Sequence, residues 1–108
     1  MRTKAMSLLG FAKKSGNLVS GVNTCGFAIA KGRAKLVILA DDISAGSEKK
    51  IMKEIRKKGV PYIKYGTIDE LSHIAGESGR SVFAVLDKGF AESILRELGS
   101  SGEPEQQS

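Results

Sequence analysis

The sequence predicts an α/β protein, a three-layer α/β/α sandwich with a mixed, mostly parallel sheet of about four strands. Segments with helical apolar spacing alternate along the chain with short strand-like segments. Two of these, residues 36–40 and 81–86, are apolar on both faces, as strands covered by helices on both sides are. The length of 108 residues suits one domain. We therefore expect a single domain over residues 1–98, followed by a disordered tail over residues 99–108.

The N-terminal half predicts two helices and two strands. The first helix is capped by Thr3 and stopped by Gly16, and one apolar face repeats at i, i+3, i+4 and i+7 through Ala5, Leu8, Leu9 and Ala12. After it we expect an extended segment over residues 17–20, a helix from Gly21 to about Lys31 that Gly32 closes, and a strand over residues 36–40.

The C-terminal half predicts three helices and two strands. The third helix starts at Ser47, has Ile51, Met52 and Ile55 on one side, and ends at Gly59 and Pro61. A strand over residues 62–65 follows, then a short helix whose start at residues 67–70 resembles a capping box, and then a strand over residues 81–86. The last amphipathic helix has an apolar side made by Phe90, Ile94, Leu95 and Leu98.

The charge of the chain favours a polyanionic partner. The net charge is +5, and both acidic residues of the tail, Glu103 and Glu105, lie outside the predicted domain, which by itself is more basic. The longest wholly apolar run, residues 36–40, is too short to span a bilayer, and the N-terminus lacks the apolar run of a secretory signal. We therefore expect a cytoplasmic protein with no membrane partner.

The second predicted helix has an unusual exposed side. A helical wheel places Val22, Cys25, Gly26 and Ile29 together as the core face. Asn23, Phe27 and Lys31 form a stripe at i, i+4 and i+8 on the other side, with Thr24 beside it. An exposed aromatic ring next to amide and ammonium groups can stack on a base or contact a partner protein. The alternative is that another element covers Phe27.

The start of this helix also favours an anion. The first turn leaves backbone N–H groups unpaired, and the helix dipole attracts negative charge there. Gly21 allows a phosphate to approach closely, and Asn23 offers both a donor and an acceptor for a base edge. An asparagine in a first turn is also a common local cap, and the sequence leaves both roles open.

Several segments together resemble a known family. They are residues 21–24 (Gly-Val-Asn-Thr), residues 31–42 from Lys31 to Asp42, residues 58–62 and residues 71–76. The sequence resembles, over about residues 3–98, the kink-turn-binding ribosomal proteins of the L7Ae type, and among them the short bacterial members. The resemblance implies a three-layer α/β/α sandwich and binding to a kink-turn, a sharply bent RNA with tandem sheared G·A pairs.

The resemblance also implies where the RNA binds. In the family, a Gly-x-Asn-Glu segment at the second helix contacts the guanines, and a lysine three residues after the glutamate helps. Gly21 and Asn23 match this pattern, whereas Thr24 stands in place of the glutamate and Phe27 in place of the lysine. Phe27 thus lacks a charge-assisted bond to guanine. The second family contact is the loop at residues 76–81, where Glu77, Ser78 and Arg80 are the candidates and only the arginine favours phosphates.

Further cations lie near the predicted site. Lys31, Arg33 and Lys35 surround the start of the strand at residues 36–40 and could neutralise phosphates, or simply form a solvated basic turn. Lys13 and Lys14 could extend this surface, although lysines at a helix C-terminus also favour the dipole. The cations of residues 49–58 lie on the polar side of the third helix and are interpreted as a solvated face.

Catalytic and metal-binding functions fit the residues less well. His73 is the only histidine and Cys25 the only cysteine, which argues against a zinc site. Acidic residues follow two predicted strands, as in receiver domains, but a phosphoacceptor aspartate is missing after the middle strand. We therefore predict a monomeric, non-catalytic RNA-binding protein without metal or cofactor. The alternatives are a protein-interaction module with Phe27 at its centre, and a small phosphate-handling enzyme.

Overall fold

Helices and strands alternate along the chain as the apolar spacing predicts. The computed structural model describes residues 3–101. Within this range the elements are α1 (Lys4–Lys14), β1 (Leu18–Ser20), α2 (Val22–Ala30), β2 (Leu36–Leu39), α3 (Ala45–Lys58), β3 (Tyr62–Lys64), α4 (Ile68–Ala75), β4 (Val82–Val85) and α5 (Lys88–Ser101). Helix α5 continues three residues past the predicted end of the domain, and the rest of the predicted tail, residues 102–108, lies outside the described residues.

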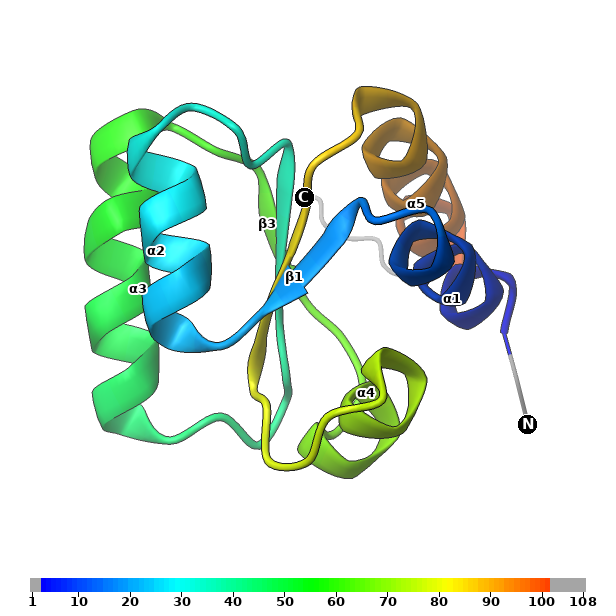
Figure 1. Cartoon of the computed structure of the whole chain (residues 1–108), viewed down its shortest axis with the longest axis horizontal. Coiled ribbons are helices and arrows are strands. Elements are labelled where there is room, and N and C mark those ends of the chain that lie inside the picture. The colour runs from blue at the N-terminus through cyan, green and yellow to red at the C-terminus, as the bar shows by residue number, and fades with distance from the viewer. Residues whose placement is uncertain (1–2, 102–108) are drawn as a thin grey trace.

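The helices form one layer on each side of the sheet, so the predicted three-layer sandwich is confirmed. Helices α2 and α3 cover one face, and α1, α4 and α5 cover the other (Figure 1). Side chains of the central strands alternate between these layers. In β2, Ile38 packs toward α1, α4 and α5, whereas Val37 and Leu39 pack toward α2 and α3. Phe83 and Ala84 of β4 divide between the two layers in the same way.

The sheet is mixed, as predicted, but the expectation that it is mostly parallel is wrong. The strand order is β1-β4-β2-β3, and β4 runs antiparallel to both of its neighbours, so that β2 and β3 are the one parallel pair of neighbouring strands in the described sheet. All four residues of β2 and of β4 are buried. A wholly apolar strand shows that helices cover both faces of the sheet. It does not fix the direction of the strand, because either direction buries the same side chains.

Local capping explains where the helices begin. The Oγ of Thr3 accepts a hydrogen bond from the backbone N–H of Met6, as predicted. Thr67 and Glu70 form the predicted capping box, each side chain accepting from the other residue's backbone N–H. Helix α3 begins two residues earlier than predicted, because Ser44 rather than a later residue is its N-cap and accepts from the N–H of Ser47.

Candidate nucleic-acid interface

The N-terminus of α2 lies against the loop at residues 76–81, on the side of the molecule where β1 ends and β4 begins (Figure 1). Gly21 joins β1 to α2 with φ 99° and ψ 145°, and its backbone N–H donates to the carbonyl of Val82 at 2.9 Å. This φ lies in the region that favours glycine. Gly21 makes no side-chain cap, so the first turn of α2 has backbone donors without a side-chain acceptor.

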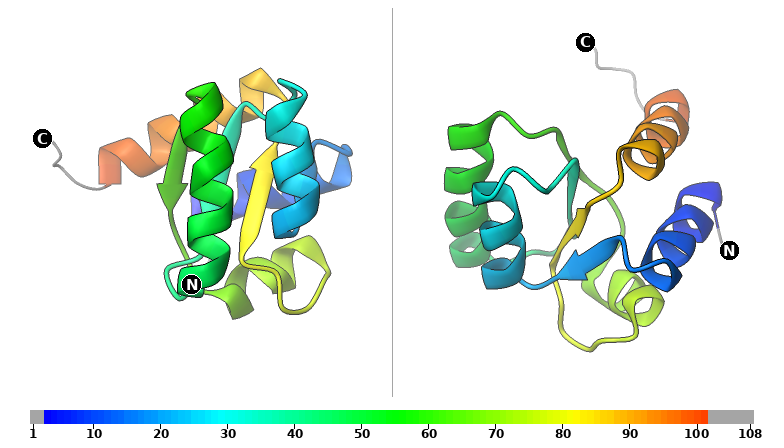
Figure 2. Two further views of the ribbon diagram at one scale, coloured as in Figure 1. Left: turned by 90° about the vertical axis from the view of Figure 1, so that its left-hand side faces the viewer. Right: turned by 45° about the horizontal axis from the view of Figure 1, so that its top comes forward.

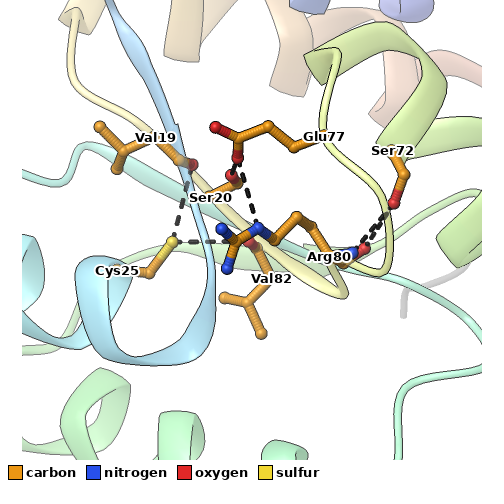
Figure 3. Close-up of polar contacts among 7 residues, drawn as sticks. All are labelled: Val19, Ser20, Cys25, Ser72, Glu77, Arg80 and Val82. Carbon is orange, nitrogen blue, oxygen red and sulfur yellow. Dashed lines mark hydrogen bonds and ion pairs between the residues drawn. The ribbon is translucent and has the colours of Figure 1, made fainter.

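The guanidinium of Arg80 covers this junction. A methyl group at Gly21 would lie 2.8 Å from Nη1 of Arg80, so the arginine occupies the space that the missing side chain leaves. Its Nε pairs with Oε1 of Glu77 at 3.3 Å, and the same carboxylate oxygen accepts a hydrogen bond from the hydroxyl of Ser20 (Figure 3). Loop and helix start are therefore connected through side chains.

The backbone of Arg80 is held by a buried serine of α4. The N–H of Arg80 donates to Oγ of Ser72 at 3.0 Å, and the same hydroxyl lies 3.2 Å from the carbonyl of Arg80, to which it donates (Figure 3). Among the described residues, Ser72 is the one buried residue with a polar side chain. Because both backbone groups of Arg80 bind one fixed hydroxyl, the arginine projects from a defined position.

Glu77 is ionised at neutral pH and partly offsets Arg80. The hydrogen bond from the Ser20 hydroxyl, together with the positive charges of Arg80 and Lys13, holds the pKa of Glu77 below its usual range. The carboxylate therefore competes with an external anion for the guanidinium. Lys13, which the sequence offered as a possible extension of the basic surface, lines a hollow of about 220 Å³ here together with Thr24 and Arg80.

Asn23 points to the α3 side of the helix and is exposed. Its Oδ1 accepts a hydrogen bond from Nζ of Lys50, at 3.0 Å. Lys50 uses one of the two lone pairs of this oxygen, so the two N–H donors of the amide and the second lone pair remain for a ligand. Local capping by Asn23, which the sequence left open, is not what the structure shows: no side-chain cap occurs at the start of α2.

Phe27 is exposed, so the alternative that another element covers it is excluded. Its relative exposure is 60%. The ammonium of Lys31 lies 5.4 Å from the ring centroid, a cation–π contact. The ring and this cation thus form one outward-facing pair on α2.

The predicted site residues divide between two ends of α2. Near its N-terminus the structure brings Glu77 and Arg80 to Gly21 and Thr24, whereas Val22 and Asn23 line the groove toward α3, and Ser78 is exposed in the loop. Arg33 and Lys35 follow the C-terminus, beyond a nine-residue helix that is about 13 Å long, and Lys35 donates to the carbonyl of Gly32. They therefore lie apart from the junction at Gly21, at the opposite end of β4, because the N–H of Lys35 donates to the carbonyl of Val85 and that of Gly21 donates to the carbonyl of Val82.

Three contributing residues were not among the predicted site residues. Ser20 and Ser72 fix Glu77 and Arg80, and Lys50 fixes Asn23. Their partners are 57, 8 and 27 residues away along the chain. The position of Ser20 directly before Gly21 was a usable signal. The sequence contains no signal for the role of Lys50, because the contact of Lys50 with Asn23 depends on how α2 and α3 pack.

The buried thiol of Cys25 allows the packing of α2 against β1 and β4 to be tested. The thiol lies within hydrogen-bonding distance of the carbonyls of Val19 and Val82, at 3.7 and 3.6 Å (Figure 3). Burial raises its pKa to about 12, against a weaker opposing effect of Arg80. A native thiol that keeps its proton should react very slowly with a thiol reagent at pH 8 and promptly in denaturant. Rapid labelling of the folded protein would contradict this packing.

The same raised pKa has a consequence for stability. The folded state holds the thiol proton more tightly than the unfolded state, whose thiol has a pKa near 9.0. The contribution of the Cys25 thiol to the free energy of unfolding is therefore fully present below pH 9 and is lost as pH rises toward 12. Denaturant titrations at several pH values measure this effect. Between pH 9 and pH 12 the free energy of unfolding should fall less in Cys25→Ala than in the unmodified protein.

Nothing in the described range indicates a metal site or a membrane segment. Residues 3–101 contain no group of three or more metal-ligating side chains close enough to share an ion. Within the same range no helix combines the length and the apolar character needed to cross a bilayer.

Relatives of known sequence match this chain over most of their length. The RNA-binding protein YlxQ of Bacillus subtilis is 36% identical over 88 residues, covering 82% of this chain and 88% of that protein. The large ribosomal subunit protein eL8 of Halobacterium salinarum is 30% identical over 105 residues, covering 95% and 88%.

Solved structures share the fold. A Bacillus halodurans protein described as having unknown function superimposes with a TM-score of 0.83 at 28% identity, covering 88% of this chain and 96% of that one. The 15.5kD RNA binding protein of Giardia lamblia superimposes with a TM-score of 0.73 at 20% identity, covering 93% and 92%. The second similarity concerns the fold alone.

Fold and surface together define a small α/β/α sandwich protein with a polar and basic site where α2 meets the loop before β4. The sequence model of the ribosomal protein L7Ae/L30e/S12e/Gadd45 family matches residues 3–95. The chain belongs to this family, and the resemblance found in the sequence is confirmed.

Proposed function

We propose that this protein is a non-catalytic RNA-binding protein that recognises kink-turn RNA, acting as a monomer in the cytoplasm. The observation that supports this most directly is the position of Arg80 beside the first turn of α2. Arg80 lies over Gly21 on one side of this turn, and the exposed amide of Asn23 lies on its α3 side, beside Lys50. The name of the relative YlxQ, which describes RNA binding, agrees with the RNA-binding part of the proposal.

The proposed mechanism divides the contacts between backbone and base. Backbone N–H groups at the start of α2 and the guanidinium of Arg80 bind phosphate. The N–H donors of Asn23 bind acceptors on a base edge, with the sheared G·A pairs of the kink-turn as the target. Arg33, Lys35 and Lys31 add positive charge at the far end of α2 and make binding sensitive to salt.

The exposed ring of Phe27 supports a second candidate, a protein-interaction module. The two candidates separate in a titration against a kink-turn RNA and a straight duplex of equal length, each at two salt concentrations. We expect tighter binding of the bent RNA at both. Equal affinity would contradict kink-turn recognition, and binding of neither RNA would leave the protein-interaction module.

Substitution of Asn23 tests the location of the site. In Asn23→Ala the base-directed donors disappear, so we expect a loss of about 1–3 kcal/mol in the discrimination between bent and straight RNA. Binding of the straight duplex should change little. The measurement is the same titration, repeated with the variant.

Asn17→Ala is the matched control. It removes the same atoms from a residue whose amide donates to Oγ of Ser15, away from the start of α2. We expect it to discriminate between the two RNAs as the unmodified protein does. If both variants behave alike, Asn23 is not in the recognition site.

A further inference from the structure

The outward face of α3 has a row of three lysines, Lys50, Lys53 and Lys57, which we call the α3 basic stripe. They lie at i, i+3 and i+7, a spacing that places them on one side of a helix. All three are exposed. Seven residues of helix separate the first from the last, about 10 Å along the axis. The stripe is therefore long enough to meet more than one phosphate of a nucleic-acid strand.

The stripe begins at the site on α2. Helices α2 and α3 lie side by side on the same face of the sheet (Figure 2). The ammonium of Lys50 lies 3.0 Å from Oδ1 of Asn23, and both residues line a groove of about 210 Å³ between the helices. A strand bound at Asn23 thus lies directly beside the first lysine of the stripe.

No acidic residue forms an ion pair with the stripe in the described part of the protein. Of the acidic residues on α3, Glu48 pairs with Lys64 at 3.1 Å. Glu54 lines the groove toward α2 and makes no ion pair with the stripe. Lys53 and Lys57 are thus available to an external anion, whereas Lys50 also binds Asn23.

The helix dipole does not account for these lysines. Cations stabilise the last turn of a helix, and of the three only Lys57 lies there. Lys50 and Lys53 lie nearer the middle, where the dipole gives no such benefit. Like charges at i, i+3 and i, i+4 also destabilise a helix. Glu54, four residues after Lys50 and three before Lys57, offsets part of this repulsion, and a bound polyanion would offset more of it.

We propose that the α3 basic stripe binds the phosphate backbone of an RNA stem that leads away from the α2 site. This inference rests on the proposed function, since it takes RNA as the ligand of that site. Lysine suits the role because its flexible side chain places a point charge near phosphates of varied position. The stripe contributes affinity and salt dependence, whereas Asn23 contributes discrimination.

The test uses Lys53→Gln/Lys57→Gln, which leaves the contact between Lys50 and Asn23 in place. Three kink-turn RNAs are compared: one with short stems, and two that each have one stem lengthened, on one or the other side of the bend. With the unmodified protein, one of the lengthened RNAs should bind more tightly than the short one. The variant should lose that gain but still prefer bent over straight RNA.

Salt dependence gives a quantitative readout. Loss of two phosphate contacts should lower the slope of log K against log salt by about 1.4–1.8. Between 50 and 200 mM salt the variant should therefore lose about 7- to 12-fold less affinity than the unmodified protein does. Lys4→Gln/Lys88→Gln is the matched control. It makes the same change in net charge on α1 and α5, on the opposite face of the sheet, and should keep the slope within about half a unit of the original.

The outcomes separate this inference from the proposed function. If the stripe variant and its control have the same slope and the same gain from a longer stem, the stripe does not bind RNA, although kink-turn recognition can still hold. If the unmodified protein binds bent and straight RNA equally, the kink-turn proposal fails, while a lowered slope in the stripe variant would still support the phosphate contacts. Absence of any RNA binding would overturn both.

Discussion

Gly21→Ala should lower both the stability of the protein and its affinity for RNA. At φ 99° and ψ 145° an alanine is strained, at a cost of about 1–3 kcal/mol in the free energy of unfolding. The new methyl group would also lie 2.8 Å from Nη1 of Arg80 and would move the guanidinium away from the start of α2. Chemical denaturation measures the first effect, and titration with kink-turn RNA measures the second.

Gly10→Ala is the control for this substitution. Gly10 lies within α1, and a methyl group there would meet no atom within 4 Å. Alanine is the better helix former, so we expect stabilisation by about 0.5–1 kcal/mol and unchanged RNA binding. The same chemical change should therefore have opposite signs at the two positions. A Gly21→Ala protein as stable as the original would show that the junction can relax and does not hold Arg80 in place.

The fold could be predicted from the sequence where short-range patterns decide it. The spacing of apolar residues in α1 and the capping box at Thr67 depend only on neighbours within one or two turns. The direction of β4 does not. It depends on where α4 and the following loop return the chain, and its wholly buried residues fit either direction.

The same distinction applies to the site. The exposed side of α2 was predictable, because helical spacing alone places Phe27 opposite Cys25. The contact of Lys50 with Asn23 was not, since it requires α3 to pack beside α2. The sequence likewise grouped Arg33 and Lys35 with the start of α2, although a helix length separates them from it. Proximity along the chain is thus a poor guide to the extent of this surface.

Phe83→Ala should cause the largest loss of stability among the variants considered. Phe83 is in the central strand β4, is 1% exposed, and packs in the layer formed by α1, α4 and α5. Removing a fully buried phenylalanine side chain costs about 3–5 kcal/mol, through lost burial and the cavity that remains. This is a large part of the stability of an ordinary domain, so the variant is expected to be partly unfolded at 37 °C. Thermal and chemical unfolding give the measurement.

Phe27→Ala is the counterpart of this substitution on the surface. The ring is 60% exposed, and its described ring contact is with Lys31, worth about 0.5–1 kcal/mol. We therefore expect a loss of no more than that in stability, several-fold smaller than at Phe83. A similar cost at both positions would mean that Phe27 is packed more tightly than its exposure indicates.

The remaining effect of Phe27 concerns its ligand. If the ring stacks on a base, Phe27→Ala should weaken RNA binding by about 1–3 kcal/mol, and Phe27→Leu should weaken it nearly as much, because leucine is apolar but has no π face. If the ring instead contacts a protein partner through its apolar area, Phe27→Leu should retain that contact and neither variant should change RNA binding. The leucine variant therefore separates the two uses of the one large aromatic side chain on the exposed face of α2.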